Sequence, residues 1–278
     1  MDKTGTLVLV ATPIGNLGDI SQRAADTLRD ADVIYCEDTR HSRRLLTHLE
    51  IRGQELVSLH EHNEAERIRA VLERLASGQT VALISDAGMP LISDPGQRLA
   101  AAATVAGHIV TAIPGPNAAL MALAISGLAT DRFHFEGFLP LKNTPRKERI
   151  EALAQLTEPT VLYEAPQRVA RTVADLLEVC GRDRSVAIAR ELTKLHEEVW
   201  RGDLAGAEPY LQDVPPRGEY CIVLGGAIIK AEVVSDDQIA AALHKQIANG
   251  LSKRDAVAAV CRQLGLPRRR VYSVALNL

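Results

Sequence analysis

Short apolar runs alternate with amphipathic segments along residues 1–117. Five runs have the length of buried strands and lie at 6–10, 33–36, 56–59, 80–84 and 108–113. Between them apolar residues recur at helical spacing, as in Ile20, Ala24 and Leu28. Asn63 is placed to cap the helix that follows it. This alternation predicts a parallel sheet with right-handed helical crossovers.

A second series of strand signals follows the rigid segment 114–117 (Pro-Gly-Pro-Asn) and an Ala/Leu-rich helix. Its predicted strands are 133–135, 160–163, 186–189 and 220–224, with a polar loop at 141–149 and a helix at 166–179. From about residue 230 the pattern is purely helical. Ser252 and Asp255 have the spacing of a capping box, Gly265 ends one helix, and Pro267 opens another.

These patterns divide the chain into three parts. We predict an N-terminal α/β domain with a parallel sheet (1–116), a second α/β domain (117–228), and a basic tail that resembles a helix-turn-helix (229–278).

The loop at 85–96 (Ser-Asp-Ala-Gly-Met-Pro-Leu-Ile-Ser-Asp-Pro-Gly) follows a predicted strand and is the main candidate for a functional loop in this chain. Asp94 and Pro95 predict a helix start, with Asp as the N-cap and Pro at the first helical position. Gly88 and Gly96 permit close approach of backbone. Twelve residues are long for a strand-to-helix connection. We therefore interpret the segment as a ligand loop, the alternative being an ordinary turn.

Polar loops follow four of the first five predicted strands, at 13–16, 37–41, 60–63 and 86–88. In a parallel sheet these loops lie on one edge, which favours a binding site there. The dinucleotide fingerprint, the P-loop and the nucleophile elbow are absent from the sequence. A metal site built on His41, His60, Glu61 and His62 is disfavoured, because residues 60 and 62 of an extended segment point in opposite directions. Glu37, Asp38 and Arg40 have an alternative interpretation as a surface ion-pair and capping group.

Composition narrows the class of protein. The 278 residues are 46% hydrophobic and 24% charged, as in globular proteins, and the 3% aromatic content requires cores of Ala, Val, Leu and Ile. The four cysteines form no CxxC pair, which favours buried thiols over disulfides or zinc. The sequence shows no signal peptide and no run of membrane-spanning length, so we expect a cytoplasmic location.

The net charge of −3 gives no reason to expect that the protein binds a nucleic acid, but the charged residues are unevenly distributed along the chain. Basic residues gather at 140–150 and 244–278, which suggests a polyanionic partner; solvated helix faces are the alternative. The candidate RNA contacts are Lys142, Arg146, Lys147, Arg268, Arg269 and Arg270. The last three fall in the first turn of the final predicted helix, where positive charge opposes the helix dipole and a bound phosphate would reverse that penalty. Pairing with the acidic N-terminal domain is the other interpretation.

Motifs along nearly the whole chain resemble the tetrapyrrole-methylase superfamily and, within it, the bacterial small-subunit ribosomal RNA methyltransferase I family. The matching segments are 12–17 (Thr-Pro-Ile-Gly-Asn-Leu), 37–41, 60–63, 85–88, 94–96, 114–116, 136–140 (Glu-Gly-Phe-Leu-Pro), 163–164, 189–194 and 218–219. The sequence departs from the family pattern at Met89, where Thr is usual, and at Gln167, where His often stands.

The resemblance implies two α/β domains with S-adenosylmethionine in the cleft between them, unlike the Rossmann-type methyltransferases. It also implies a 16S rRNA or small-ribosomal-subunit substrate, 2′-O-methylation of a cytidine ribose, and a homodimer. Carried onto this sequence, the cofactor contacts are Pro13, Ile14, Gly15, Asp86, Gly88, Met89, Asn117, Ala118, Tyr163, Leu192 and Glu219.

Methyl transfer to a hydroxyl requires alignment of the reacting atoms and removal of the hydroxyl proton, and it requires no metal. Candidate bases are Glu37, Asp38 and His60, and Arg40 and Lys194 are candidates to hold phosphates or to lower the pKa of the alcohol. Three alternatives remain: a methylase of tetrapyrrole or corrinoid precursors, a non-catalytic RNA-associated regulator with the same fold, and an ordinary α/β enzyme whose basic patches only solvate it.

Overall fold

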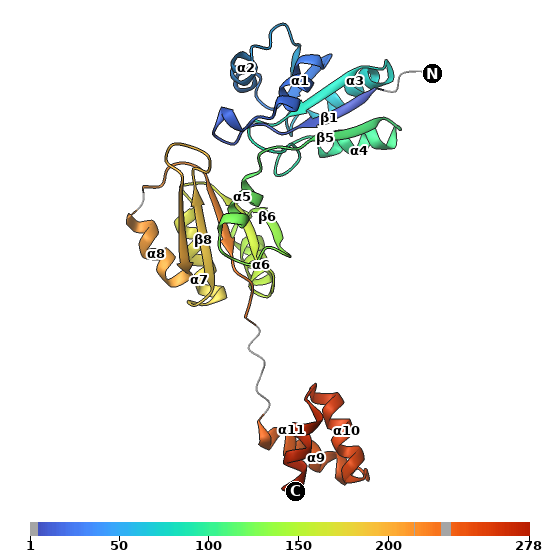
Figure 1. Cartoon of the computed structure of the whole chain (residues 1–278), viewed down its shortest axis with the longest axis vertical. Coiled ribbons are helices and arrows are strands. Elements are labelled where there is room, and N and C mark those ends of the chain that lie inside the picture. Colours follow the sequence, from blue (N-terminus) through green and yellow to red (C-terminus); the bar gives the residue numbers. More distant parts are fainter. Residues whose placement is uncertain (1–4, 214, 229–234) are drawn as a thin grey trace. The chain divides into compact units, whose positions relative to one another are not determined.

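A computed structural model describes residues 5–213, 215–228 and 235–278 of the chain. The chain forms two compact units, Met1–Ala227 and Ile228–Leu278 (Figure 1). The first unit holds two five-stranded sheets and the second holds the last three helices.

The first sheet is entirely parallel, as predicted. Its strands run in the order β3-β2-β4-β1-β5, and each adjacent pair is parallel. The strands are β1 Thr6–Val10, β2 Val33–Cys36, β3 Leu56–Ser58, β4 Thr80–Ile84 and β5 Ile109–Ile113. The connecting helices are η1 Leu17–Asp19, α1 Gln22–Asp30, α2 Thr39–His48, α3 Glu64–Ala76 and α4 Gln97–Val105.

Aliphatic side chains bury both faces of this sheet. Helices α1 and α2 cover one face, where Leu28 and Leu46 pack on Val8, Ile34 and Ile84. Helices α3 and α4 cover the other face through a cluster that includes Val71, Leu75, Leu99, Leu7 and Leu83. The central strands β1, β2 and β4 are covered on both sides and appear in the sequence as apolar runs, whereas the edge strands β3 and β5 are more exposed.

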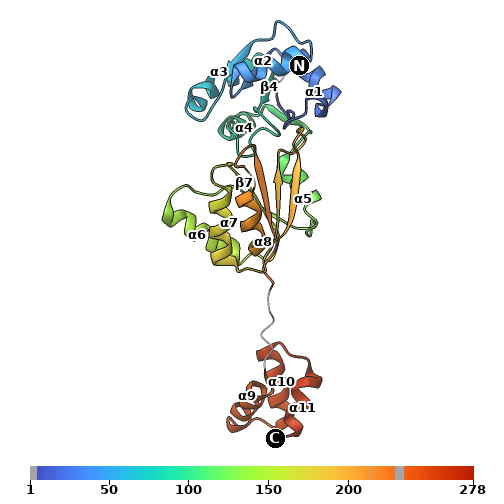
Figure 2. The same cartoon turned by 90° about the vertical axis from the view of Figure 1, so that its left-hand side faces the viewer.

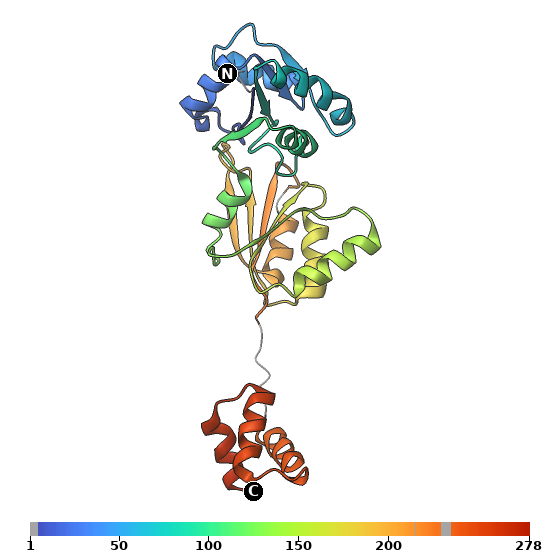
Figure 3. The same cartoon turned by 90° about the vertical axis from the view of Figure 1, so that its right-hand side faces the viewer.

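The second sheet is mixed, and its order is β6-β7-β10-β8-β9. Strands β6 and β7 are parallel, and the other three pairs are antiparallel. The strands are β6 His134–Phe138, β7 Thr160–Glu164, β8 Ser185–Arg190, β9 Glu198–Asp203 and β10 Tyr220–Leu224, and the helices are α5 Ala118–Ile125, α6 Asn143–Ala154, α7 Val169–Cys180 and α8 Leu204–Asp213. Helices α6, α7 and α8 cover one face and α5 covers the other (Figures 2 and 3).

Two elements of this half were not predicted correctly. Residues 143–154 form helix α6 and not a polar loop. The sequence did not reveal this helix, because the charged Arg146 occupies a buried position beside Ile150 and Leu153 and interrupts the apolar stripe. Strand β9 was missed, because it is a half-exposed edge strand rich in charged residues that pairs only with β8.

Helix starts also differ from expectation. Helix α4 begins at Gln97 with Gly96 at the N-cap (φ 112°), so Asp94 and Pro95 lie before it. The Leu99 N–H in the first turn has no acceptor within the helix, and it donates a hydrogen bond to the buried Glu64 carboxylate of α3 (3.0 Å). Asn63 stands at the N-cap of α3 without capping it; its amide contacts the Ser58 carbonyl and the His60 N–H instead.

The second unit comprises α9 Asp236–Ala248, α10 Lys253–Leu264 and α11 Arg268–Leu276, around a core that includes Ile239, Leu243, Val257, Val260 and Val271. Ser252 accepts the Asp255 N–H (3.2 Å), and Gly265 ends α10 with a left-handed φ of 63°, as predicted. The Ser252 hydroxyl also donates to the Asp255 carboxylate, so the reciprocal bond of a full capping box is replaced by a contact between side chains.

All four cysteines are free; Cys36 and Cys221 are buried, and Cys180 and Cys261 are partly exposed. Across the described ranges, which omit 1–4, 214 and 229–234, no helix is both long and apolar enough to cross a membrane.

Candidate functional site

The loops after β1 and β4 are joined by backbone hydrogen bonds. The Thr12 N–H donates to the Gly88 carbonyl (2.9 Å), and the Gly88 N–H donates to the Thr12 carbonyl (3.1 Å). Gly88 has a φ of 83°, and a Cβ there would lie 3.3 Å from the Ile14 side chain. The position therefore requires glycine both for its backbone conformation and for the space beside Ile14.

A pocket of about 420 Å³ lies where these loops meet the second sheet. This volume is within the range of small-molecule sites. We call the part of the unit that holds the parallel sheet its first half and the part that holds the mixed sheet its second half. The residues of the first half that line the pocket are Ile14, Asp86, Ala87, Gly88, Met89, Ile92, Ser93 and Asp94. From the second half it is lined by Asn117, Ala118, Phe138, Tyr163, Glu164, Ala165, Pro166, Glu219, Tyr220 and Cys221. Of the residues expected to contact the cofactor, Pro13, Gly15 and Leu192 are the ones that do not line it.

Backbone strain concentrates in two loops of this unit. Among the described residues, five that are not glycine have a positive φ, and four of them lie in the segments 91–93 and 191–193: Leu91, Ser93, Glu191 and Thr193. The first segment belongs to the long loop that we expected to bind a ligand. Such conformations persist only where the surroundings impose them, and they gather at functional sites.

Three carboxylates of the first half influence one another at the carboxyl edge of its sheet. Burial, together with the charges of Glu37 and Asp86, raises the pKa of Asp94 to about 6, against a hydrogen bond from Ser85 that lowers it. Burial and the charge of Asp86 also raise the pKa of Glu37, which His60 partly offsets. The structure therefore brings Glu37 and His60 together with Asp86 and with Asp94, whose role we had interpreted as capping.

The other candidates in this half have local partners. Asp38 is the N-cap of α2 and accepts the Arg40 N–H (2.8 Å), while the Arg40 guanidinium, 91% exposed, pairs with it at 3.3 Å. Hydrogen bonds from the Arg40 side chain and backbone lower the pKa of Asp38. This geometry is that of the surface capping group considered as the alternative.

His60 and His62 do not point apart as expected. Their ring centroids are 6.0 Å from each other, because the segment is a turn and not an extended strand. Within the ranges that the structure describes, no group of three or more His, Cys, Asp or Glu side chains is arranged to hold a metal ion.

Lys194 lies on the second half and contacts the first. Its Nζ donates to Glu191 (2.8 Å) and Glu219 (3.0 Å). Burial lowers the pKa of Lys194, and these two hydrogen bonds outweigh it and raise the pKa, so the group is a cation and not a base. A Cβ on Gly15 would lie 2.4 Å from the Lys194 Cγ, so the β1 loop packs directly on this side chain.

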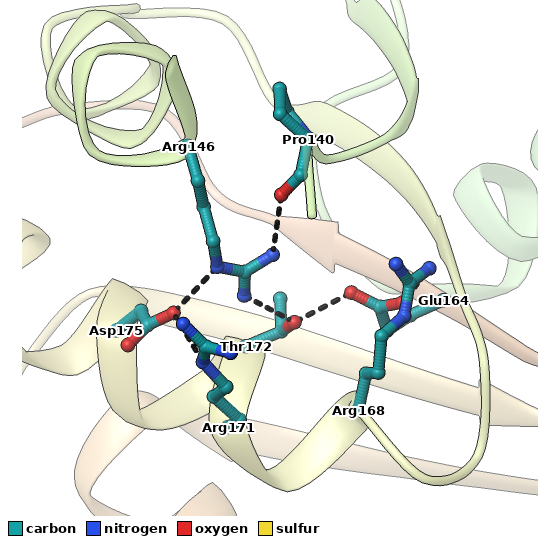
Figure 4. A network of polar contacts seen from close by, with 7 residues as sticks. All are labelled: Pro140, Arg146, Glu164, Arg168, Arg171, Thr172 and Asp175. Carbon is teal, nitrogen blue, oxygen red and sulfur yellow. Dashed lines mark hydrogen bonds and ion pairs between the residues drawn. The ribbon is translucent and has the colours of Figure 1, made fainter. Parts of the chain in front are cut away.

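The predicted RNA contacts at 142–147 separate into two kinds. Lys142 and Lys147 are exposed, and Lys147 lies 3.9 Å from Glu151. Arg146 is buried, with its side chain 5% exposed, and it donates to Asp175 (2.7 Å) and Thr172 (2.8 Å) (Figure 4). Its guanidinium is committed to the interior, so we withdraw Arg146 as an RNA contact.

In the helical unit Arg268 and Arg269 are exposed in the first turn of α11, as expected. Arg270 is half-buried and lies 3.8 Å from Asp236 at the start of α9. Arg270 therefore has an internal partner in its own unit.

Sequence reasoning missed several pocket residues from the second half. Phe138, Ala165 and Pro166 come from segments separated by more than twenty residues, so only the strand pairing of β6 with β7 brings them together. Glu164 follows the predicted Tyr163 and shares the pocket wall with it. The signal that was available is that Phe138 and Glu164 both belong to the motifs quoted above.

Comparison with known proteins gives three results. The family model of Tetrapyrrole (Corrin/Porphyrin) Methylases matches residues 6–208. A protein of Synechocystis sp. named ribosomal RNA small subunit methyltransferase I is 46% identical over 275 residues, 99% of this chain and 98% of that protein. One of the same name from Halalkalibacterium halodurans is 41% identical over 277 residues, 98% of this chain and 95% of that protein.

Solved structures share the fold. A cobalt precorrin-4 methyltransferase is similar with a TM-score of 0.62 and 17% identity, covering 80% of this chain and 95% of that chain. A Thermus thermophilus uroporphyrin-III C-methyl transferase complexed with S-adenosyl homocysteine is similar with a TM-score of 0.55 and 18% identity, covering 79% of this chain and 96% of that chain.

Proposed function

We infer the function from one premise: the chain belongs to the tetrapyrrole methylase family and, within it, to the ribosomal RNA small subunit methyltransferases I. The protein is thus an S-adenosylmethionine-dependent methyltransferase of ribosomal RNA. Our proposal for its specific reaction is 2′-O-methylation of a cytidine ribose in 16S rRNA, in the cytoplasm, where ribosomal subunits are assembled.

The observation that carries this proposal is the extent of the similarity. The family model ends at residue 208, and the precorrin and uroporphyrin enzymes cover at most 80% of the chain. The Synechocystis and Halalkalibacterium relatives named for ribosomal RNA match 99% and 98% of it. Their similarity therefore extends over helices α9–α11, which the shared methylase fold does not require. This favours an RNA substrate over a tetrapyrrole or corrinoid precursor.

The pocket fits S-adenosylmethionine. Ile14, Met89, Ala118 and Tyr163 offer apolar surface for a neutral purine and ribose, and the carboxylates at its wall suit a ligand that carries a sulfonium and an ammonium group. In this proposal the cofactor is held by Ile14, Asp86, Gly88, Met89, Asn117, Ala118, Tyr163 and Glu219. Pro13, Gly15 and Leu192 do not line the pocket and position the residues that do. S-adenosylmethionine supplies an activated methyl group when it is bound.

The chain's own residues then handle the acceptor hydroxyl. Asp94 lines the pocket and Glu37 lies close to it. The pKa of Glu37 is raised and that of Asp94 is raised to about 6, which suits Asp94 to accept a proton near neutral pH at the carboxyl edge of the first sheet. We assign proton removal to this pair, with His60 lying beside Glu37. Asp38 serves as the cap of α2, which presents Arg40 to solvent and to RNA phosphates. Lys194 serves as a fixed cation between the halves.

We propose that RNA contacts Lys142 and Lys147 on α6 and Arg268 and Arg269 on α11, with Arg270 supporting the latter through Asp236. No acidic residue stands in the first turn of α11, where the exposed Arg268 and Arg269 add positive charge to the helix start, so a phosphate there is attracted by both.

Replacing Arg268 and Arg269 with Ala tests this contact and leaves the Arg270 pair in place. The slope of log K against log salt for rRNA binding is expected to fall by ~0.7 for each phosphate that the variant no longer neutralises. The variant Arg23→Ala/Arg52→Ala removes the same charge from exposed positions of the first unit and is expected to leave the slope unchanged. Equal slopes for wild type and the Arg268/Arg269 variant would contradict the contact.

A homodimer is also part of the proposal. Strand β5 is an edge of its sheet, and Ile109 on it is 53% exposed. Exposed apolar edges are usually covered. Light scattering of wild type and of Ile109→Lys distinguishes the states: we expect a dimer for wild type and a shift toward monomer for the variant.

A methyl-transfer assay with labelled S-adenosylmethionine tests the function directly. The substrates are small ribosomal subunits, free 16S rRNA and a corrinoid precursor, and nucleoside digestion then locates the label. Label in 2′-O-methylcytidine is the expected result. Label in the corrinoid would favour the tetrapyrrole alternative, and cofactor binding without transfer to any substrate would favour a non-catalytic regulator.

A further inference from the structure

Phe138 stands half exposed at the pocket, although aromatic side chains are scarce in this protein. The chain has three phenylalanines, and the ring of Phe138 is 52% exposed while lining the pocket. Single exposed apolar residues need no explanation by themselves. The position of Phe138 does need an explanation, because several features of its surroundings fix it.

A β-bulge sets the direction of Phe138. The pairing of β6 with β7 shifts between Phe135 and Gly137, so that Phe138 stands opposite Tyr163. Gly137 has a φ of 68°, and a Cβ there would lie 3.0 Å from the Ser93 Oγ of the facing half. Bulges redirect side chains and are common beside active sites.

Neighbouring side chains hold the ring from two sides. Tyr163 lies with its centroid 5.7 Å from that of Phe138, and the Arg168 guanidinium carbon lies 6.0 Å from the Phe138 centroid. Arg168 in turn pairs with Glu164 at 2.6 Å, and the Glu164 side chain is 1% exposed. The ring therefore has a cation and an aromatic neighbour in defined places.

A buried polar network anchors this arrangement (Figure 4). Thr172 donates to Glu164 (2.6 Å) and accepts from Arg146 (2.8 Å), which also donates to Asp175 (2.7 Å). Ion pairs placed this deep are costly to desolvate and seldom serve stability alone. Here the network reaches Arg168 through Glu164, and the Arg168 guanidinium lies over the Phe138 ring.

We propose that Phe138, backed by Tyr163 and Arg168, is the surface on which the pyrimidine base of the acceptor nucleotide stacks. The inference rests on the proposed function, because it assumes that a ribose enters the pocket. A ribose hydroxyl reaches a reaction centre inside a pocket only when its nucleotide leaves the stack of its neighbours, and stacking on a protein ring replaces what is lost. Phe138 is 52% exposed, so part of its surface is open to that contact.

A fluorescence titration tests the base contact without relying on activity. Trp200 is the sole tryptophan of the chain, so Phe138→Trp in a Trp200→Phe background places one reporter at the pocket. With S-adenosylhomocysteine present, cytidine 5′-monophosphate is expected to change the emission saturably, and ribose 5-phosphate, which lacks the base, is not. Equal responses to both ligands, or none to either, would overturn the proposal. So would a change caused by S-adenosylhomocysteine alone and none on adding the nucleotide.

Transfer kinetics on small ribosomal subunits provide the second measurement. Phe138→Ala is expected to lower kcat/KM for the subunit roughly 5- to 150-fold, the range for losing one base–aromatic stack. Its Kd for S-adenosylmethionine by calorimetry is expected to stay within about twofold of wild type, and Phe138→Tyr is expected to keep most of the activity. Phe133→Ala is the matched control, since Phe133 is 40% exposed just before β6 and does not line the pocket.

The two measurements separate the outcomes. Wild type that methylates no ribosomal RNA would refute the proposed function, while the fluorescence titration still decides whether a base stacks on residue 138. Active wild type with unchanged kcat/KM in Phe138→Ala would refute the stacking surface alone.

Discussion

The two halves of the first unit hold their carboxylates in opposite ways. In the parallel half, Glu37, Asp86 and Asp94 influence one another, and within the described part of the chain none of them forms an ion pair with Lys or Arg. In the mixed half the carboxylates near the pocket are paired, Glu164 with Arg168 and Glu191 with Lys194.

We interpret this difference as a division between carboxylates that exchange protons and carboxylates that position other side chains. Burial and neighbouring negative charge raise the pKa of Glu37 and raise that of Asp94 to about 6, so Asp94 exchanges a proton near neutral pH. Carboxylates paired with cations, as Glu164 is with Arg168 and Glu191 with Lys194, fix the side chains around them. In our proposal the first half therefore removes the proton, while the second half holds aromatic and cationic groups in place beside the pocket.

The largest effect is expected from removing an unpaired carboxylate. Asp94→Asn and Glu37→Gln should each lower single-turnover methyl transfer by ~10²–10⁴-fold, because no neutral amide accepts the hydroxyl proton. Glu55→Gln, a paired carboxylate outside the pocket, serves as the control. Retention of more than about a tenth of the wild-type rate in both variants would remove this pair from the mechanism.

A buried cation of the mixed half is expected to matter for stability. Arg146→Ala should lower the free energy of unfolding by about 3 kcal/mol, because it breaks the contacts to Asp175 and Thr172 and leaves them without their donor. The exposed Lys147→Ala on the same helix should change it by less than about 0.5 kcal/mol. Urea unfolding measures both, and similar values for the two variants would contradict the division between buried and exposed cations.

Contact between the halves is tested at Gly15. In Gly15→Val the new side chain meets Lys194 and Thr193, whose nearest atoms lie 2.4 Å and 2.9 Å from the added Cβ. Overpacking of this kind costs about 1–3 kcal/mol, so we expect the Kd for S-adenosylmethionine to rise roughly 5- to 150-fold. Gly18→Ala, whose Cβ would meet only the Asn16 side chain at 3.2 Å, is the control in the same loop. Calorimetric titration giving wild-type affinity for Gly15→Val would show that the loop does not shape the pocket.

The smallest effect concerns stability against pH. Asp94 has a folded-state pKa of about 6, above its usual value near 3.9, so the folded state binds more protons between those values. Its contribution to stability therefore falls as pH rises from about 4 to 6. Because the side chain is only half buried, solvent screens part of this, and at pH 7 we expect Asp94→Asn to be more stable by about 1 kcal/mol.

The corresponding rise in Tm is about 2–4 °C, with the exposed Asp30→Asn as the control. Melting curves at pH 4 and pH 7 check the sign. A variant that gains stability at pH 4 and not at pH 7 would contradict the raised pKa.

Local pattern was sufficient for much of the architecture. The aliphatic runs at 6–10, 33–36 and 80–84 predicted strands that the structure contains, because strands covered on both faces need apolar residues at every position. Gly265 predicted a helix end for a reason confined to its own backbone, which adopts a left-handed φ of 63°. The loop at 85–96 indicated a ligand site through its length and its glycines, and seven of its residues line the pocket.

Tertiary structure decided what each polar side chain does. Arg146 looked like a surface cation in a loop, and the neighbouring helix α7 makes it a buried ion-pair partner. Asp94 had the position of a cap, and its burial, together with the charges of Glu37 from another loop and of Asp86, raises its pKa to about 6. Phe138 and Glu164 face one pocket only because β6 pairs with β7 through a bulge. Backbone conformation depends on neighbours along the chain, whereas burial, charge and pKa depend on neighbours in space.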